Sequence, residues 1–325
     1  MKTQTLCILG GTGFVGRHLI SEVTEAGWRV RVPTRRRARH RDLTVNPRVS
    51  LVEADVHDPA ALAEQLSGCE AVVNLIGILN EAGHDGSGFR RAHVELARKL
   101  VQAAREQGVT RVLHMSALNA DAHSEHGYYL KTKGEAEELM HGAGGEGLQV
   151  TSFRPSVIFG PGDSFFNRFA ALLRWSPGLL PLACAGARFA PVYVGDVAKA
   201  FARALRDKAT MGERYELCGP HIYTLRELVE YTARTAGLKR HVLPLGDGLS
   251  HLQARVLEYA PGKPFSLDNY YSLQKDSVCG GSGLQDLGIE PTALEAVVPQ
   301  YLGRQNSRAR YSVARRLAGR DAGRS

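Results

Sequence analysis

The chain has 325 residues, of which 43% are hydrophobic and 23% are charged, a balance typical of a globular protein with a large core. It contains no run of about 18 apolar residues, which argues against a membrane-spanning helix. The formal net charge is +8, but seven Arg and one Asp lie between Tyr301 and Ser325, so the rest of the chain is nearly balanced. A nucleic acid is therefore not the expected ligand. We expect residues 303–325 to form a basic, disordered tail, with contact to anionic lipid, RNA or an acidic partner as the alternative.

The start of the chain and its cysteines both indicate a reducing compartment. Met-Lys-Thr-Gln-Thr leads directly into an apolar segment, which leaves no room for a signal peptide and predicts a cytoplasmic location, with peripheral association at the inner face of a membrane left open. The cysteines are odd in number and form no C-x-x-C pair, so we expect free thiols at Cys7, Cys69, Cys184, Cys218 and Cys279. The histidines form no ligand-spaced cluster, which predicts that no metal is bound.

The first predicted elements are a strand over residues 5–9 and a helix that begins near residue 14, joined by "GGTGFVG" at residues 10–16. In this setting the glycines are typical of a dinucleotide-binding turn. Gly10 takes the tight turn, Gly13 lets the backbone approach a pyrophosphate, and Gly16 lets the helix pack closely on the strand. Phe14 and Val15, between the last two glycines, are included among the predicted cofactor contacts.

Strands and helices then alternate along the first half of the chain. The patterns predict strands at 28–35, 49–56, 70–79, 110–118 and 148–160, and helices at 59–66, 88–107 and 128–140. This alternation predicts an α/β fold, a Rossmann doubly wound parallel sheet with a smaller C-terminal part that covers the substrate. We assign residues 1–160 to the NAD(P)-binding domain, with 190–200 returning to it, and residues 161–302 to the smaller part, built mainly from about 160–190 and 215–302.

The residues that follow the second and third strands indicate which dinucleotide is bound. The second strand ends in Pro33-Thr34-Arg35-Arg36-Arg37, without the carboxylate that would hold the ribose hydroxyls of NAD. A guanidinium group matches the geometry of a phosphate, so Arg35 and Arg36 favour NADP(H) over NAD(H). After the third strand, Asp55 is placed to accept a hydrogen bond from the adenine and Val56 to pack on its ring, although both residues equally fit a loop that enters a helix.

A proton-transfer site is predicted at Tyr129 and Lys133, which lie four residues apart and so share one face of a helix. The ammonium group of Lys133 would favour the phenolate of Tyr129, making it a usable acid or base. Ser116, at the end of the fifth strand, would hydrogen-bond a substrate carbonyl.

With these motifs the chain resembles the extended and atypical short-chain dehydrogenase/reductases, which are related to the epimerase/dehydratase proteins. The resemblance rests on "GGTGFVG", "YLKTKGEAE", "FRPSVIFGPGD" and "PVYVGDVAKA" and spans residues 4 to about 300. "VVNLIGIL", "HMSALNA" and "RPSVIFGPGDSFFNRFA" further resemble the NAD(P)H-binding accessory subunit of respiratory complex I and its bacterial relatives.

This resemblance implies a Rossmann domain with tightly bound NADPH and association with a respiratory complex. It places Tyr129 and Lys133 at the nicotinamide ribose, Arg154 and Pro155 on the nicotinamide side, and Asp196 in a structural hinge. One departure is that Ser116 is followed by Ala117 and Leu118, where extended members carry further hydroxyl residues. A serine one position too deep in the strand would impair reductase chemistry.

An apolar stripe formed by Phe165, Phe166, Phe169, Leu172 and Leu173 predicts a further helix. We interpret it as core packing, with a lining for a lipophilic or quinone-like substrate, or a docking face near a membrane, as the alternative.

Three functions remain open. They are an oxidoreductase acting on a lipophilic carbonyl or hydroxyl, a non-catalytic assembly or sensor subunit stabilised by its cofactor, and a sugar-nucleotide epimerase or dehydratase using arginines such as Arg168, Arg174 or Arg188.

Overall fold

A parallel β-sheet forms the centre of the computed structural model, which describes residues 4–260 and 263–302. Within these residues the main sheet has seven strands in the order β11-β6-β5-β4-β1-β2-β3, and every neighbouring pair is parallel. The strands are β1 (Thr5–Leu9), β2 (Arg29–Thr34), β3 (Val49–Glu53), β4 (Ala71–Asn74), β5 (Arg111–Met115), β6 (Gln149–Pro155) and β11 (Arg214–Leu217). The chain order reverses between β1 and β4, and open sheets of this type bind ligands beyond the carboxyl ends of the strands at such a point.

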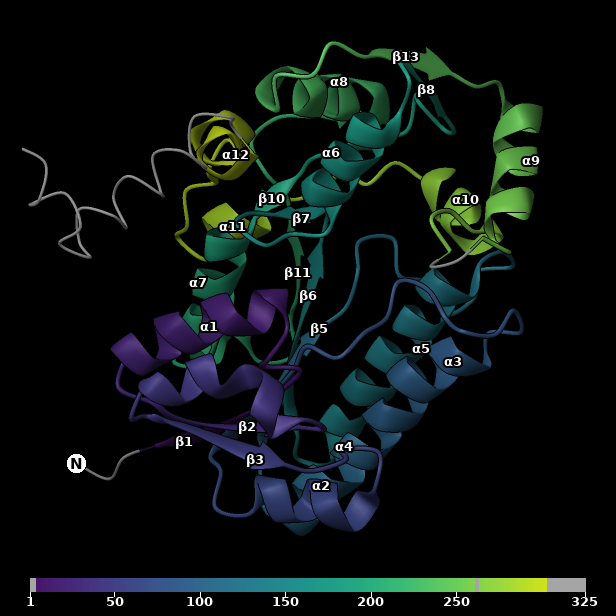
Figure 1. Cartoon of the computed structure of the whole chain (residues 1–325). Coiled ribbons are helices and arrows are strands. Elements are labelled where there is room, and N and C mark those ends of the chain that lie inside the picture. Colours follow the sequence, from purple (N-terminus) through teal and green to yellow (C-terminus); the bar gives the residue numbers. More distant parts are fainter. Residues whose placement is uncertain (1–3, 261–262, 303–325) are drawn as a thin grey trace, which may run out of the picture.

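Helices cover both faces of this sheet, as Figure 1 shows. One face packs against α1 (Phe14–Glu25), α7 (Val194–Ala204) and the short α11 (Gly283–Asp286). The other packs against α2 (Pro59–Leu66), α4 (Leu96–Glu106) and α5 (Tyr128–Gly142). The helix α3 (Ser87–Arg90) continues through a π-helical turn, η2 (Arg91–Glu95), into α4. The 3-10 segments are η1 (Arg37–Val45), η3 (Ala143–Glu146) and η4 (Lys208–Thr210). The strands carry apolar side chains on both faces because helices cover both faces of the sheet.

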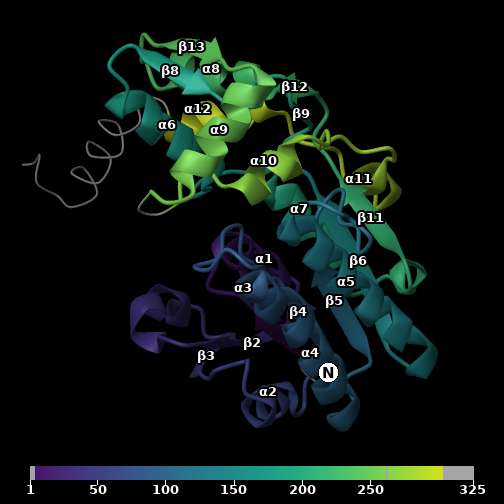
Figure 2. The ribbon, with the colours of Figure 1, turned by 90° about the vertical axis from the view of Figure 1, so that its right-hand side faces the viewer.

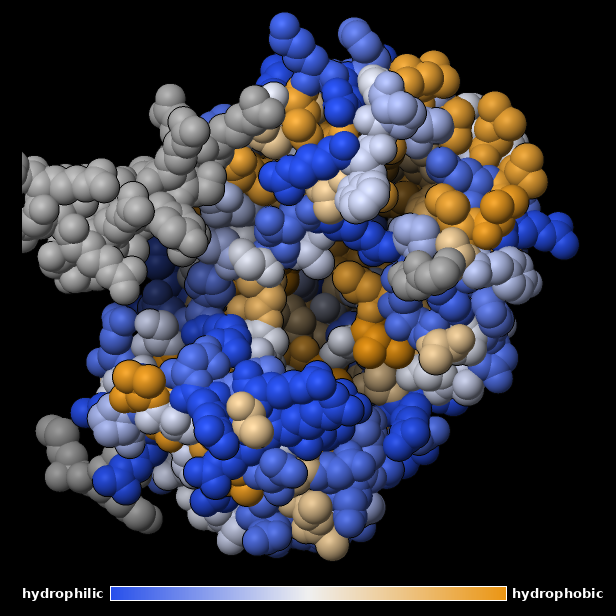
Figure 3. Space-filling view, in the orientation of Figure 1, coloured by the Kyte–Doolittle hydropathy of each residue, from blue (hydrophilic) through white to orange (hydrophobic). Residues whose placement is uncertain are grey.

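The remaining elements form a smaller part beyond the carboxyl ends of β6 and β11 (Figure 2). Its helices are α6 (Phe165–Trp175), α8 (Leu225–Thr235), α9 (Asp247–Leu257), α10 (Leu267–Leu273) and α12 (Leu294–Leu302). Its short strands pair as β7 (Ile158–Phe159) with β10 (Val192–Tyr193), β8 (Leu179–Leu182) with β13 (His241–Pro244), and β9 (Arg188–Phe189) with β12 (Tyr223–Thr224). A separate apolar core holds this part together. The molecular surface is hollowed between the two parts (Figure 3).

The predicted fold class is confirmed, and the differences lie at element ends and at one edge of the sheet. The predicted strand at 70–79 ends at Asn74, and the one at 148–160 is interrupted after Pro155. Residues from 215 onward were assigned to the smaller part, but β11 pairs in parallel with β6 and so extends the main sheet. A strand as short as "RYEL" carries little hydrophobic pattern of its own, and its neighbour in the sheet defines it.

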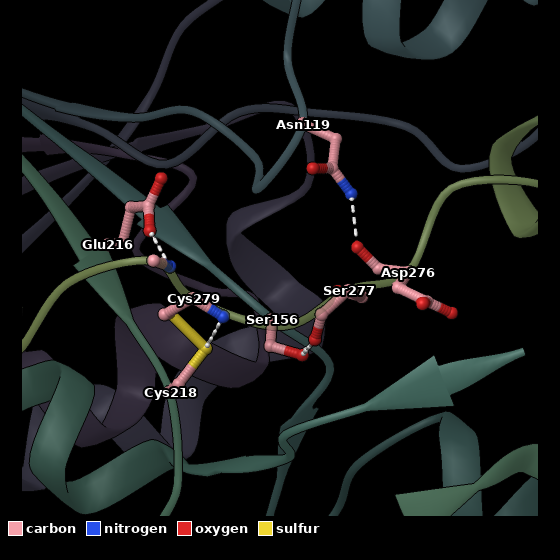
Figure 4. Close-up of a disulfide and its surroundings, with 8 residues drawn as sticks. Asn119, Ser156, Glu216, Cys218, Asp276, Ser277 and Cys279 are labelled. Carbon is pink, nitrogen blue, oxygen red and sulfur yellow. Dashed lines mark hydrogen bonds between the residues drawn. A yellow bond between two sulfur atoms is a disulfide. The ribbon is translucent and has the colours of Figure 1, made fainter. Parts of the chain in front are cut away.

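The prediction that all cysteines are free is wrong, because Cys218 and Cys279 form a disulfide (Figure 4). Cys218 directly follows β11, and Cys279 lies on the segment that leads into α11. Hydrogen bonds flank the bridge: Gly280 N donates to Glu216 Oε2 (2.7 Å) and Ser156 Oγ donates to Ser277 O (2.7 Å). The two cysteines are 61 residues apart, a separation that carries no signal in the sequence. Cys7, Cys69 and Cys184 are free thiols, as predicted.

Candidate functional site: a dinucleotide cradle beside Tyr129

The glycine turn between β1 and α1 has the conformation that the sequence predicted. Gly10 has a φ of +78°, in the left-handed region that favours glycine. A Cβ atom on Gly16 would lie 2.5 Å from Gly11 Cα, so only glycine allows α1 to approach this turn so closely. Gly13 is the N-cap of α1 and makes no side-chain capping bond. The backbone N–H groups at the start of α1, which include Phe14 and Val15, therefore fit an anionic pyrophosphate.

The segment that follows β2 is rich in arginine. Arg35 and Arg36 are exposed, and their guanidinium groups make no hydrogen bond or ion pair with the residues that the structure describes. Glu53, at the end of the neighbouring strand β3, accepts a hydrogen bond from Arg37 N (3.1 Å). Beside them lies an open cavity of about 450 Å³ lined by Arg37, Ala38, Arg41, Thr44 and Glu53. This surface fits a phosphate group.

Asp55 lies in the loop after β3, where it was predicted either to contact the adenine or to belong to the entry of the next helix. Asp58, not Asp55, caps α2, since its Oδ1 accepts a hydrogen bond from Ala60 N (2.9 Å). Asp55 is exposed and accepts a hydrogen bond from His57 N (3.0 Å), while Val56 is buried in the sheet core. Burial lowers the pKa of His57, and Arg91, Lys99 and Arg35 lower it further. Asp55 thus remains available to a ligand, in a cationic neighbourhood.

Lys133 is held at the carboxyl ends of β4 and β5. Its side chain is only 3% exposed, and Nζ donates a hydrogen bond to Met115 O (2.9 Å). A Cβ atom on Gly77, in the loop after β4, would lie 2.9 Å from this nitrogen. Burial lowers the pKa of Lys133 to about 8, although Glu137 opposes the shift. The amine is therefore mostly charged at pH 7, but it loses its proton more easily than an exposed lysine does.

Tyr129 is one turn earlier on α5, in an aromatic environment. Its ring lies 5.8 Å from the ring of His93 and 6.1 Å from that of Phe89, in edge-to-face geometry. Burial raises the pKa of Tyr129 to about 12, and the Asp268 carboxylate adds to the shift. The expectation that Lys133 would favour the phenolate is therefore wrong for the protein alone, because desolvation penalises the charged phenolate. A protonated Tyr129 suits a proton donor better than a base.

Two residues that the sequence analysis did not single out position Tyr129. Asp268, on α10, accepts hydrogen bonds from Tyr129 N (3.1 Å) and Tyr128 N, and so caps α5 from a distant element. His93 accepts a hydrogen bond from Ile78 N at Nε2 (3.2 Å), which assigns the ring proton to Nδ1, 2.8 Å from Thr132 Oγ1. For His93, the sequence offered only one signal, a histidine within the helix predicted at 88–107.

Ser116 lies directly after β5 and is 2% exposed. Its hydroxyl has no hydrogen-bond partner among the described residues, and the same holds for Nε2 of His114, which strand alternation places on the same face. Ala117 and Leu118, which follow, are also buried. The Ser116 hydroxyl is thus unsatisfied, and it forms no hydrogen bond with Tyr129.

Arg154, predicted to lie on the nicotinamide side, forms an ion pair. Arg154 binds the carboxylate of Glu137, with Nη2 2.8 Å from Oε1, and Arg214 binds the same oxygen at 2.7 Å. Glu137 is 1% exposed, so these contacts fix α5 to β6 and β11. Pro155 ends β6, and its carbonyl accepts a hydrogen bond from Leu118 N (3.1 Å).

Two further predictions concern α6 and α7. Four residues of the stripe on α6 pack in the apolar core of the smaller part, with Phe166 and Leu173 fully buried and Phe165 and Phe169 partly buried. Leu172 is 38% exposed, so the interpretation as core packing is confirmed for the rest of the stripe only. Asp196 is fully buried and accepts a hydrogen bond from Thr292 N (2.7 Å), which joins α7 to the segment before α12 as the hinge role implies.

A second cavity, of about 310 Å³, lies beside the start of α5. Its lining combines aromatic and charged side chains, among them Phe89, Tyr128, Glu258, Tyr259, Lys263 and Asp268. In the part of the chain that the structure describes, no group of side chains is arranged to hold a metal ion. None of the described helices is both long and apolar enough to cross a bilayer.

The glycine cradle, the parallel sheet and the Tyr129–Lys133 pair define a dinucleotide-binding protein of the Rossmann type. Residues 6–218 match the NAD dependent epimerase/dehydratase family, and the chain belongs to this family. It is 28% identical to the NADH-ubiquinone oxidoreductase 40 kDa subunit of Neurospora crassa mitochondria, over 95% of this chain and 82% of that protein. It is 31% identical to a ceramide reductase of Caulobacter vibrioides, over 74% of each chain. A dTDP-glucose 4,6-dehydratase from Streptomyces venezuelae, solved with NAD, shares the fold with a TM-score of 0.72 at 22% identity, over 95% of this chain and 98% of that one.

Proposed function

We propose that this protein binds NADP(H) and reduces a carbonyl group on a lipophilic molecule. The observation that carries the proposal is the half-buried Tyr129, one turn of α5 before the buried Lys133, whose Nζ donates to Met115 O at the end of β5. Its raised pKa keeps the tyrosine hydroxyl protonated near neutral pH. A reductase needs a proton donor at this place. The 31% identity to a ceramide reductase supports a lipophilic substrate.

The cofactor would be held by residues whose geometry suits it. Gly10, Gly13 and Gly16 form the cradle for the pyrophosphate, and Arg35 and Arg36 supply unpaired cations for the 2′-phosphate of NADP. Asp55 and Val56 border the adenine end. When bound, the reduced nicotinamide supplies the hydride.

The chain's own residues supply the proton. Tyr129 donates the proton of its hydroxyl to the substrate oxygen, and His93 and Asp268 fix its position through the contacts described above. Lys133 stabilises the negative charge that Tyr129 carries afterwards. The unsatisfied hydroxyl of Ser116 is the candidate to hydrogen-bond the substrate carbonyl.

The choice of cofactor is tested by titrating NADPH and NADH into the full chain by calorimetry. Replacing Arg35→Ser removes a charge-assisted contact to the 2′-phosphate, and we expect about tenfold to hundredfold weaker NADPH binding with NADH binding unchanged. Arg39→Ser is the matched control, because Arg39 is equally exposed but lies further from the end of β2. Tighter binding of NADH than of NADPH to the unmodified protein would contradict the proposal.

A second candidate is a subunit that holds NADP(H) without turning it over. Two observations favour it: the burial of Ser116 and Ala117, where a carbonyl-polarising hydroxyl is needed, and the likeness to a subunit of NADH-ubiquinone oxidoreductase. Retention of NADPH through purification, with no oxidation of it by any candidate substrate, is the result expected of this alternative.

A sugar-nucleotide epimerase or dehydratase receives less support. Among its candidate diphosphate ligands, Arg188 is paired with Asp276 (2.7 Å) and Arg168 donates to Lys263 O (3.1 Å). The solved structures with nucleotide sugars share the fold alone. Thermal stabilisation by a UDP- or dTDP-sugar would support this function, since a ligand at 100 times its Kd raises the free energy of unfolding by about 2.7 kcal/mol.

A further inference from the structure

We propose that the outer face of α9, with neighbouring side chains of β8 and β13, docks on an anionic lipid bilayer. This α9 face consists of Leu249, Leu252, Val256 and Tyr259, which are 58%, 54%, 61% and 75% exposed. Their spacing of three or four residues places them on one side of the helix and its C-terminal extension. Hydrophobic residues gather over this helix and near β8 and β13 at the upper right of Figure 3, and Figure 1 shows the elements in the same orientation.

The apolar surface continues beyond α9. Gln253 on α9 donates a hydrogen bond to Pro181 O of β8 (3.4 Å), so the helix lies against the β8–β13 pair. Leu179 and Leu243 on these strands are 48% and 45% exposed. Trp175, which ends α6 four residues before Leu179, is 89% exposed. A monomeric protein rarely exposes so many large apolar side chains together without a binding partner, and Trp and Tyr are enriched at the interface between lipid and water.

The charges around this surface favour an anionic bilayer over a second copy of the chain. Arg174, Lys239 and Arg255 are exposed, and their side chains make no ion pair or hydrogen bond with the described residues. The acidic side chains on and just after α9 are already occupied: Asp247 accepts a hydrogen bond from Tyr270 Oη (2.6 Å), and Glu258 lies 3.1 Å from His84 Nδ1. Unpaired cations beside exposed apolar groups match the charged surface of anionic lipid, whereas two copies would bring these cations together.

Docking there would also orient the cavity beside the start of α5 toward the bilayer. Glu258 and Tyr259, at the end of α9, and Lys263 line the 310 Å³ cavity that Tyr128 and Asp268 also border. A lipophilic substrate could then pass from the bilayer to the site without crossing water. This last consequence rests on the proposed function, while the docking itself does not.

The test is flotation of the full chain with vesicles of 70% phosphatidylcholine and 30% phosphatidylglycerol. We expect the protein to float with these vesicles, and the double variant Leu252→Glu with Val256→Glu to bind at least about tenfold more weakly, since burying one such side chain is worth about that factor. The matched control is Val45→Glu with Ile222→Glu, at sites that are 85% and 53% exposed outside the docking surface. The control should float like the unmodified protein, and the basic C-terminal residues are present in all three proteins.

Each other outcome overturns the proposal. Absence of flotation of the unmodified protein removes the bilayer as partner. Equal flotation of the Leu252→Glu, Val256→Glu variant assigns binding to the basic C-terminal residues instead. A dimer by light scattering that this variant dissociates, without vesicle binding, identifies an interface between copies. NADPH binding by the same preparations shows that the variants are folded, and it tests the proposed function independently of flotation.

Discussion

Burial sets the protonation of the side chains around Tyr129. It raises the pKa of Tyr129 to about 12, lowers that of Lys133 to about 8 and lowers that of His93 to about 2, with the charge of Lys133 adding to the last shift. Near neutral pH the tyrosine and the histidine are therefore both uncharged. A neutral tyrosine at this place is prepared to donate a proton.

The buried, neutral His93 predicts that acid weakens the fold. Its pKa is about 2 in the folded protein and near 6.5 when unfolded, so the unfolded chain binds more protons between these values. Stability is complete above pH 6.5 and falls as the pH drops, by up to about 1.4 kcal/mol per pH unit for this group.

We expect His93→Gln to unfold with a shallower pH dependence than the unmodified protein between pH 6 and 4.5. The measurement is urea unfolding at a series of pH values, compared by slope because the substitution also lowers stability at every pH. Parallel curves for the two proteins would show that His93 is protonated in the folded state.

Only part of this residue-scale picture could be read from the sequence. The four-residue spacing of Tyr129 and Lys133 correctly placed both on one helix. Both pKa shifts depend on burial, and that of Tyr129 also on Asp268, 139 residues further along the chain, which no local pattern encodes. The ion pair of Arg154 with Glu137 was missed for the same reason.

At the scale of elements, α5 and α1 are each fixed at the end that faces the site. The N-cap of α5 is Gly127, which has no side chain to accept a hydrogen bond, and Asp268 from α10 replaces it. The smaller part thereby stabilises the helix that carries Tyr129, which couples the two parts of the molecule.

Removing this cap in Asp268→Ala should lower the free energy of unfolding by about 1–2 kcal/mol, the usual cost of losing an N-cap. Asp268→Asn keeps an oxygen acceptor and should lose less than half of that amount. Denaturant unfolding measures both. If the two variants lose equal stability, the carboxylate charge matters and the cap geometry does not.

Substitution of Gly16 tests the role of the glycine turn between β1 and α1. In Gly16→Ala the new methyl group would lie 2.5 Å from the Cα atom of Gly11, and backbone must shift to make room. We expect a loss of about 1–3 kcal/mol in stability and at least tenfold weaker NADPH binding. Gly142→Ala is the control, since nothing lies within 4 Å of its Cβ position; it should be neutral or slightly stabilising. NADPH affinity that survives in Gly16→Ala would place the cofactor elsewhere.

Element positions were predictable wherever apolar periodicity decides them. The strand at 5–9 and the helix at 59–66 have the predicted bounds, and most of the stripe on α6 packs in the core, with Leu172 exposed. The same type of pattern on α9 is exposed. Periodicity reports that a helix has an apolar face, but not whether another part of the chain covers it.

At the scale of the whole molecule, the chain returns to its first domain after building α6 and several short strands of the smaller part, and it forms the other helices of that part afterwards. The strand β11 extends the sheet beside β6, and Cys218 at its end is bonded to Cys279. The bridge closes a loop of about 60 residues that includes α8, α9 and α10. Such a tether restricts the unfolded chain and holds the smaller part against the sheet.

Breaking this bridge in Cys218→Ser with Cys279→Ser should cost about 2–4 kcal/mol. Thermal and urea unfolding under oxidising conditions measure the loss. Cys184→Ser, which changes a half-buried free thiol, is the control and should stay close to the unmodified protein. If a reductant leaves the melting temperature of the unmodified protein unchanged, the bridge does not contribute to the stability in solution.

The central claim is most directly tested by following the absorbance of NADPH while the full chain is offered long-chain ketones. The account predicts that at least one of them is reduced, and that Tyr129→Phe slows the reaction at least a hundredfold with NADPH affinity retained. Tyr128→Phe, which changes the exposed neighbour, should react at nearly the normal rate. Equal rates for Tyr129→Phe and the unmodified protein, or NADPH that stays bound and is never oxidised, would contradict the reductase account.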